Sequence, residues 1–176
     1  MTDSRLALLK DSVRDVPDFP KPGILFKDIT PLLGNHAAFD ACLSLLEEQA
    51  REMDAEVVVG MESRGFLFGA PLALRLGLPF VPARKPGKLP AKSVKVEYEL
   101  EYGTDALEMH ADAMKTGART VIVDDLIATG GTAAATGDLV EEVGGVVAGF
   151  LFVIELGFLD GRARLEPHRV ESLWKV

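Results

Sequence analysis

The chain has few of the residues on which several functional classes depend. Its 176 residues include one cysteine, three histidines and one tryptophan. A single cysteine excludes an internal disulfide. Because Cys42 lies among alanine and leucine in a helical pattern, we expect it to be a small buried apolar residue. The histidines have neither metal-ligand spacing nor a serine or cysteine partner motif, so we expect them to be structural or surface residues and not direct metal ligands.

Basic residues are also in deficit, and no apolar run is long. Nineteen Lys and Arg against twenty-seven Asp and Glu give a net charge of −8 and a pI near 4.9. This charge disfavours a nucleic-acid partner. No stretch approaches the roughly 18 apolar residues of a membrane span, and the first residues have too short an apolar run for a signal peptide. We therefore expect a cytoplasmic protein with no nucleic-acid or membrane partner.

Strand and helix patterns alternate along most of the chain. Strand patterns occupy residues 56–60, 79–83, 121–123 and 146–154, and helix patterns occupy 5–13, 35–53, 65–76 and 131–143. Such alternation predicts an α/β fold with a central, mainly parallel sheet flanked by helices on both faces. Period-two alternation over 94–101 predicts a half-exposed strand, and the tail from Gly157 has no clear pattern. The length predicts a single domain, residues 1–176.

The segment T-V-I-V-D-D-L-I-A-T-G-G-T-A from Thr120 is the most informative one. Its β-branched run predicts a strand buried on both faces, which places Asp124 and Asp125 at the carboxyl end, where open α/β sheets bind ligands. A loop without bulky side chains follows, and it comprises Ala128, Thr129, Gly130, Gly131 and Thr132. Such a loop before a helix can offer several N–H groups and a helix dipole to a phosphate.

The two carboxylates suit hydroxyl groups and not an anion. The pair and the loop together therefore predict a ribose 5-phosphate ligand. The alternative is a strand end whose Asp and Thr side chains only cap the next helix.

A local basic segment interrupts the acidic background. Residues 84–95 contain five cations, no acid, two prolines and a glycine. Charge runs are usually solvated surface. The proline and glycine spacing favours a functional loop that would bring cations to a polyanionic ligand.

These segments together resemble the type I phosphoribosyltransferases, and among them the members that act on adenine. The segment from Thr120 resembles the phosphoribosyl pyrophosphate (PRPP) signature. The other matches are F-P-K-P-G-I-L-F-K-D-I-T-P from Phe19, E-S-R-G-F-L-F-G from Glu62, R-K-P-G-K-L-P from Arg84 and L-E-Y-G-T-D-A-L-E from Leu100. The resemblance implies the type I phosphoribosyltransferase fold, with a small N-terminal hood (residues 1–34) and a flexible lid loop (84–95).

The resemblance also implies the reaction and the partners. Adenine and PRPP would give AMP and pyrophosphate, in purine salvage, with Mg²⁺ held mainly by PRPP. A homodimer paired through the helices that flank the sheet is implied as well. Rival functions are a phosphoribosyltransferase for another base, such as xanthine, and a purine-sensing DNA-binding regulator, for which neither the length nor the pI leaves room.

The resemblance assigns roles to individual residues. Pyrophosphate would be bound by Ser63 and Arg64, in a turn with a non-proline cis peptide, and by Lys85 and Lys88. Adenine would be read by main-chain groups of Leu25 and Lys27, with its ring between Phe26 and Leu126. Position 27 departs from the arginine usual in the family, and lysine cannot reproduce a planar fork.

The resemblance makes Glu101 the candidate for proton transfer at the purine, because bond formation at N9 requires a proton to leave the base. The alternative is that Glu101 is one more outward residue of a strand that already has Glu97 and Glu99.

Overall fold

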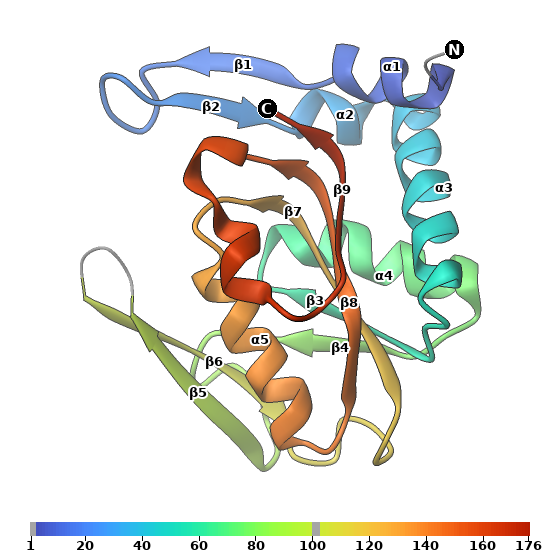
Figure 1. Ribbon diagram of the computed structural model, residues 1–176, viewed down its shortest axis with the longest axis vertical. Helices are drawn as coiled ribbons and strands as arrows, with labels where there is room; N and C mark the ends of the chain where they lie inside the picture. Colours follow the sequence, from blue (N-terminus) through green and yellow to red (C-terminus); the bar gives the residue numbers. More distant parts are fainter. Residues whose placement is uncertain (1–2, 100–102) are drawn as a thin grey trace. The chain divides into compact units, whose positions relative to one another are not determined.

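The computed structural model describes residues 3–99 and 103–176 (Figure 1). The chain divides into two compact units, one ending at Leu45 and the other running from Leu46 to Val176. Within the described residues, no helix has both the length and the apolar composition needed to cross a bilayer.

The first unit is built around a short hairpin. It contains α1 (Ser4–Asp11), β1 (Arg14–Pro17), β2 (Leu25–Asp28), α2 (Thr30–Gly34) and the first part of α3 (His36–Glu52). β1 and β2 pair antiparallel, so the proline-rich stretch between them forms the hairpin turn. Cys42 is fully buried in α3, and this burial raises the pKa of its thiol to about 12. The expectation of an inert apolar cysteine is confirmed.

The second unit contains a five-stranded parallel sheet. In chain order its strands are β3 (Val57–Met61), β4 (Phe80–Ala83), β7 (Arg119–Ile127), β8 (Val146–Glu155) and β9 (Val170–Lys175). Their order across the sheet is β4-β3-β7-β8-β9, and each neighbouring pair is parallel. The predicted fold class is therefore confirmed, although β9 lies in the tail that gave no clear pattern.

Two helices cover opposite faces of this sheet. α4 (Arg64–Leu76) leads from β3 outward to β4, whereas α5 (Gly131–Glu142) leads from β7 in the other direction to β8. Because both crossovers are expected to be right-handed, they place their helices on opposite faces. Figure 1 shows α5 in front of the sheet and α4 behind it. The strand order therefore reverses between β3 and β7, and ligands of open α/β sheets bind at such a switch point.

The core of this unit follows from its strand sequences. β3 is buried along its whole length and Val121 to Val123 are fully buried, as expected for strands covered on both faces. The largest buried side chains include Phe68, Phe150 and Phe152. α4 approaches β7 closely at Gly65, where a Cβ would lie 2.7 Å from the carbonyl oxygen of Val123. Glycine at this position lets the start of α4 pack directly on the carboxyl half of β7.

An antiparallel hairpin completes the unit. Its strands are β5 (Ser93–Glu99) and β6 (Thr104–His110), and it packs beside α5 (Figure 1). The predicted alternation holds, since Val94, Val96 and Tyr98 are partly buried against the core while the residues between them are exposed. β5 begins at Ser93, so the last residues of the expected lid, including Lys95, belong to a strand. Only the stretch between β4 and β5 remains as a candidate loop.

Candidate functional site

The paired carboxylates lie within β7, two and three residues before its last residue, Ile127. The prediction that they terminate the strand is correct only on one side, because β7 pairs with β3 through Val123 and with β8 through Ile127. The register pairs Gly60 of β3 with Val123, and β3 ends one residue later at Met61, so Asp125 lies beyond the end of β3. The two aspartates therefore border the open side of the switch point while the β8 side holds their backbone in place.

The environment of this pair disfavours two negative charges. Burial raises the pKa of Asp124 well above its ordinary value, and the neighbouring Asp125 carboxylate adds to the effect. Asp125 is 2% exposed, and its Oδ2 lies 2.8 Å from Nε of Arg64. Burying the Asp124 and Asp125 carboxyl groups side by side lowers the stability of the fold. Such a cost is typical of residues that bind a ligand.

The loop after β7 forms a cradle of backbone N–H donors. Within the described residues, the N–H groups of residues 129–132 donate to no acceptor, and α5 begins at Gly131. These N–H groups and the positive end of the helix dipole converge on a pocket of about 210 Å³. The pocket is also lined by Arg64, Asp124, Leu126 and Ala128. The predicted phosphate loop and the predicted diol site are thus neighbours.

The glycine at position 130 is required by the packing of the loop against a distant part of the chain. It adopts φ +81°, a left-handed conformation that favours glycine. A Cβ at Gly130 would lie 2.3 Å from the carbonyl oxygen of Gly161 and so would meet protein backbone before it met an anion. The loop is therefore shaped partly by the distant residue Gly161.

A second turn of the same kind joins β3 to α4. The Glu62–Ser63 peptide bond is cis, as the family resemblance implies. The N–H groups of Ser63 and Gly65 donate to no acceptor within the described residues. A pocket of about 260 Å³ lies against Glu62, Ser63, Arg64, Asp124 and Asp125. The structure thus brings the two predicted anion sites together on either side of the aspartate pair.

The Glu62 carboxylate binds several residues of the basic segment, a role that the sequence did not predict. It accepts from the backbone N–H of Lys85 at 2.9 Å, from Nε of Arg84 at 3.2 Å and from Nζ of Lys88 at 3.0 Å. Burial alone would raise the pKa of Glu62, but these three donors outweigh it and lower the pKa to about 2. Arg84 and Lys88 therefore have a carboxylate partner, and the start of the basic segment is anchored to Glu62.

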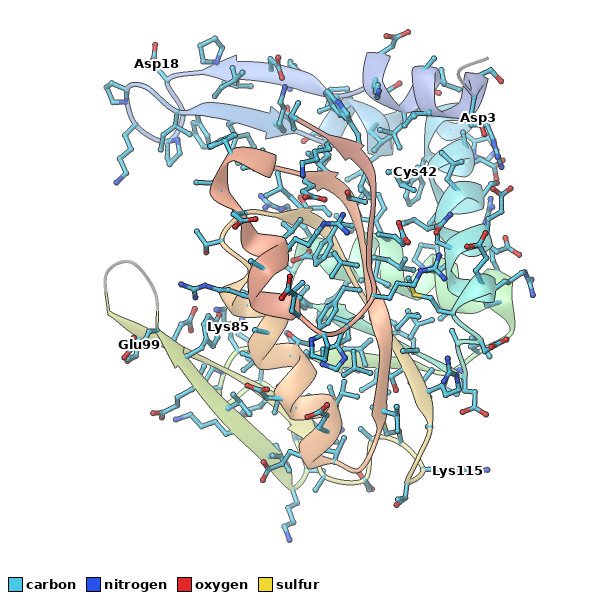
Figure 2. All side chains as sticks on the ribbon, in the orientation of Figure 1. Asp3, Asp18, Cys42, Lys85, Glu99 and Lys115 are labelled. Atoms are coloured by element: carbon cyan, nitrogen blue, oxygen red, sulfur yellow. The ribbon has the colours of Figure 1, made fainter. Side chains whose placement is uncertain are left out.

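Lys85, labelled in Figure 2, is held at its side chain as well. Its Nζ forms an ion pair with Asp105 and donates to the hydroxyl of Tyr98 at 3.3 Å. The same hydroxyl lies 3.4 Å from Oγ1 of Thr132. Tyr98 thus connects the basic segment with the first turn of α5. Asp105 belongs to the L-E-Y-G-T-D motif, which is the signal that could have identified it.

The predicted adenine residues of the first unit lie on β2. Leu25 and Lys27 are two residues apart on one strand, so their backbone groups face the same edge. Nζ of Lys27 lies 2.6 Å from Oδ1 of Asp15 on β1, and Phe26 packs edge-to-face on Phe19 with ring centroids 5.1 Å apart. The Lys27 side chain is therefore engaged within its own hairpin. Glu101 lies outside the described residues.

A larger pocket lies away from this chemistry. It has a volume of about 680 Å³ and is lined by Glu56, Val57, Pro79 and residues 112–118, which include Lys115 (Figure 2). These residues precede or begin strands, so the pocket opens at the amino end of the sheet. The convergent donors and carboxylates are at the carboxyl end, where this fold binds ligands.

Comparison with known proteins identifies the family of the chain. The family described as "Phosphoribosyl transferase domain" matches residues 29–171. The chain belongs to the phosphoribosyltransferase family. Members of this family are pentosyltransferases, and the expected enzyme class is thereby confirmed.

Relatives within the phosphoribosyltransferase family cover nearly the whole chain. The adenine phosphoribosyltransferase of Chloroflexus aurantiacus is 56% identical over 173 residues, which is 98% of each chain. The crystal structure of adenine phosphoribosyltransferase from Thermoanaerobacter pseudethanolicus matches with a TM-score of 0.94 and 53% identity, over 97% of this chain and 99% of that one. The Saccharomyces cerevisiae enzyme, complexed with an imino-altritol bisphosphate and adenine, matches with a TM-score of 0.91 and 45% identity, over 97% of this chain and 98% of that one.

Proposed function

We propose that the chain transfers the phosphoribosyl group of PRPP to adenine, giving AMP and pyrophosphate in purine salvage. The observation that carries the proposal is the free N–H cradle of residues 129–132 beside the Asp124–Asp125 pair. A phosphate next to a diol fits this arrangement. The adenine phosphoribosyltransferase of Chloroflexus aurantiacus and the yeast structure with adenine bound support adenine as the base.

The donor would be divided between the two cradles. Ala128 and the N–H groups of residues 129–132 would hold the 5′-phosphate, and Asp124 and Asp125 would accept hydrogen bonds from the ribose hydroxyls. The pyrophosphate group would lie on Ser63 and Arg64, and Arg64 is the one cation among the described residues that line that pocket. Lys85 and Lys88 would join it by exchanging Asp105 and Glu62 for phosphate oxygens.

The chemistry requires a positive charge to develop on the ribose as pyrophosphate leaves. The buried carboxylates of Asp124 and Asp125 would stabilise this oxocarbenium-like state, since a fixed charge in a site of low dielectric needs no reorganisation. N9 of adenine then bonds to C1 of the ribose, and the proton on the purine must depart. We propose that Glu101 takes part in this transfer.

The residues of the site could bind Mg²⁺ only together with the substrate. Asp124 and Asp125 offer the oxygen ligands that Mg²⁺ prefers, but the described residues contain no group of three or more side chains suited to hold a metal. We propose that Mg²⁺ is held mainly by PRPP oxygens, with the two aspartates in outer contact. Bound there, the ion would neutralise charge on the leaving pyrophosphate.

Adenine would be bound by main-chain groups of Leu25 and Lys27, with its ring between Phe26 and Leu126. The ion pair of Lys27 with Asp15 supports a main-chain role, because the side chain is already engaged. A site that accepts a hydrogen bond from the 6-amino group of adenine would face a carbonyl oxygen in hypoxanthine, and unpaired buried acceptors are costly.

The deciding assay measures AMP formation and compares adenine, hypoxanthine, guanine and xanthine as acceptors with PRPP. We expect kcat/KM to favour adenine over hypoxanthine by at least 10²-fold, the scale reached when a polar site lacks its partner. Comparable values for adenine and xanthine would instead identify an enzyme for another base.

We also propose that the enzyme is a homodimer that pairs through the outer face of α4. Leu67 and Leu74 are 44% and 83% exposed there, with exposed Ala70 between them. An apolar helix face of this kind is typical of a subunit contact. Light scattering should give a dimer for the native chain and a monomer for Leu74→Glu. A native monomer would refute the proposal.

A further inference from the structure

The C-terminal segment reaches back to the proposed phosphate loop. Gly161 opens η2 (Gly161–Leu165), after β8 and the short helix η1 (Gly157–Leu159). A Cβ built on Gly161 would lie 2.2 Å from the carbonyl oxygen of Ala128 and 2.9 Å from the backbone N of Gly130. The backbone of residue 161 therefore touches the backbone of the loop with no side chain between them.

Conformation does not explain the glycine at position 161. Its φ is not among the left-handed values that favour glycine, so alanine could adopt the same backbone. An alanine side chain would nevertheless not fit there. Both of the nearest atoms belong to the backbone, which cannot move aside as a flexible side chain could. Close packing against the loop is the physical requirement at this position.

The next residue anchors this contact to the sheet. Nη2 of Arg162 lies 2.7 Å from Oε2 of Glu155, and its Nε lies 3.3 Å from Oε1 of the same carboxylate. The Arg162 guanidinium also donates to the carbonyl oxygen of Val170 on β9. Glu155 is 3% exposed and is itself held by Ser172 and Lys175. Two strands of the sheet thus fix the position of Gly161.

We propose that Gly161 is a positioning residue for the 5′-phosphate, and that Arg162 holds it against the Ala128–Gly130 backbone. The contact sets how far the loop can open, and therefore where its N–H groups point. This inference rests on the proposed function for the identity of the ligand. It adds a part of the chain that no motif includes.

The test compares the binding of ribose 5-phosphate and of pyrophosphate, the two parts of PRPP. In Gly161→Ala, calorimetry should show ribose 5-phosphate binding about 10- to 100-fold weaker than native, because a 1 Å misplacement can cost about 100-fold. Pyrophosphate binding should change less than about twofold, since its proposed cradle is the turn between β3 and α4, away from Gly161. Gly149→Ala is the matched control. A Cβ there would lie 2.9 Å from the carbonyl oxygen of Arg169, so it should lower Tm without weakening ribose 5-phosphate binding.

A milder variant covers the case in which Gly161→Ala does not fold. Arg162→Lys keeps the charge but loses the fork, and should weaken ribose 5-phosphate binding several-fold while sparing pyrophosphate. Unchanged ribose 5-phosphate binding in either folded variant, equal weakening of both ligands, or no binding by the native chain would overturn the inference. AMP formation by the native chain separately tests the proposed function, and its absence alongside a selective loss of ribose 5-phosphate binding would refute only that function.

Discussion

Replacing Glu62 by glutamine should release the basic segment without disturbing the sheet. The best reporter is the backbone N–H of Lys85, which donates to Oε2 of Glu62 at 2.9 Å. An amide keeps one acceptor but loses the charge that also holds Arg84 and Lys88. The segment would then open more often, and the Lys85 N–H would exchange with solvent more rapidly.

The size of the effect follows from the three contacts. Arg84 and Lys88 side chains are 32% and 51% exposed, so solvent screens their ion pairs and each contributes about 0.2–1 kcal/mol. Weakening the hydrogen bond from Lys85 adds about 1 kcal/mol. The local opening free energy should therefore fall by about 2 kcal/mol, which corresponds to about 30-fold faster exchange.

The pH dependence gives a second measurement on the native protein. The pKa of Glu62 is lowered from 4.5 to about 2 in the folded state. A lowered carboxyl pKa means that the stabilisation is complete above pH 4.5 and is lost as pH falls towards 2. Protection of the Lys85 N–H, measured by NMR hydrogen exchange, should follow this course.

Glu97→Gln is the control, because Glu97 pairs with Lys95 at 2.6 Å and not with the segment before β5. It should leave the exchange of Lys85 unchanged. If Glu62→Gln exchanged at the native rate, or if native protection were lost around pH 4.5, Glu62 would not hold the segment.

Three further substitutions test the proposed site. Asp124→Asn should raise Tm at pH 7 and lower kcat/KM by about 10²-fold or more, because it removes a buried carboxyl whose raised pKa costs stability, yet leaves one acceptor for hydroxyls. That cost declines as pH falls below the raised pKa and is gone below the ordinary value of 3.8; a lower Tm in the variant at pH 7 would contradict this. Tyr98→Phe should cost about 1 kcal/mol in urea unfolding, since Lys85, Asp105 and Thr132 lose a shared partner; an unchanged midpoint would refute the connection. Glu101→Gln should lower kcat by about 10²–10⁴-fold with little change in substrate binding, whereas Glu99→Gln should cost much less; a nearly fully active Glu101→Gln enzyme would move proton transfer to another group.

Local patterns in the sequence predicted much of the fold. The buried strand at 121–123, the α4 helix closed by Gly77 and the alternating strand from Val94 all follow from residue order and short-range sterics. β9 was missed because its burial is mostly intermediate, which weakens the period-two signal. The carboxyl end of β7 was also predicted too early. Its pairing with β3 stops at Val123, whereas its pairing with β8 continues to Ile127.

The candidate site was predictable where its residues are adjacent in sequence. Asp124 and Asp125 with the following loop, and Ser63 with Arg64, form short motifs, and the structure brings them together. The contacts of Glu62 with residues 84–88 and of Gly161 with the 128–130 backbone join segments distant in sequence. No local pattern encodes such contacts, because only the order of strands in the sheet makes them neighbours.

Pairing the basic segment with carboxylates has a consequence for turnover. Unpaired cations at residues 84–88 would bind pyrophosphate tightly and release it slowly. Because Asp105 holds Lys85 and Glu62 holds Lys88, pyrophosphate bound as proposed would have to exchange these carboxylates for its own oxygens, which would lower its net affinity. After the proposed reaction, the same carboxylates would compete for the cations and favour product release. An acidic chain with a net charge of −8 can thus use a cationic segment for a highly charged substrate without trapping the charged product.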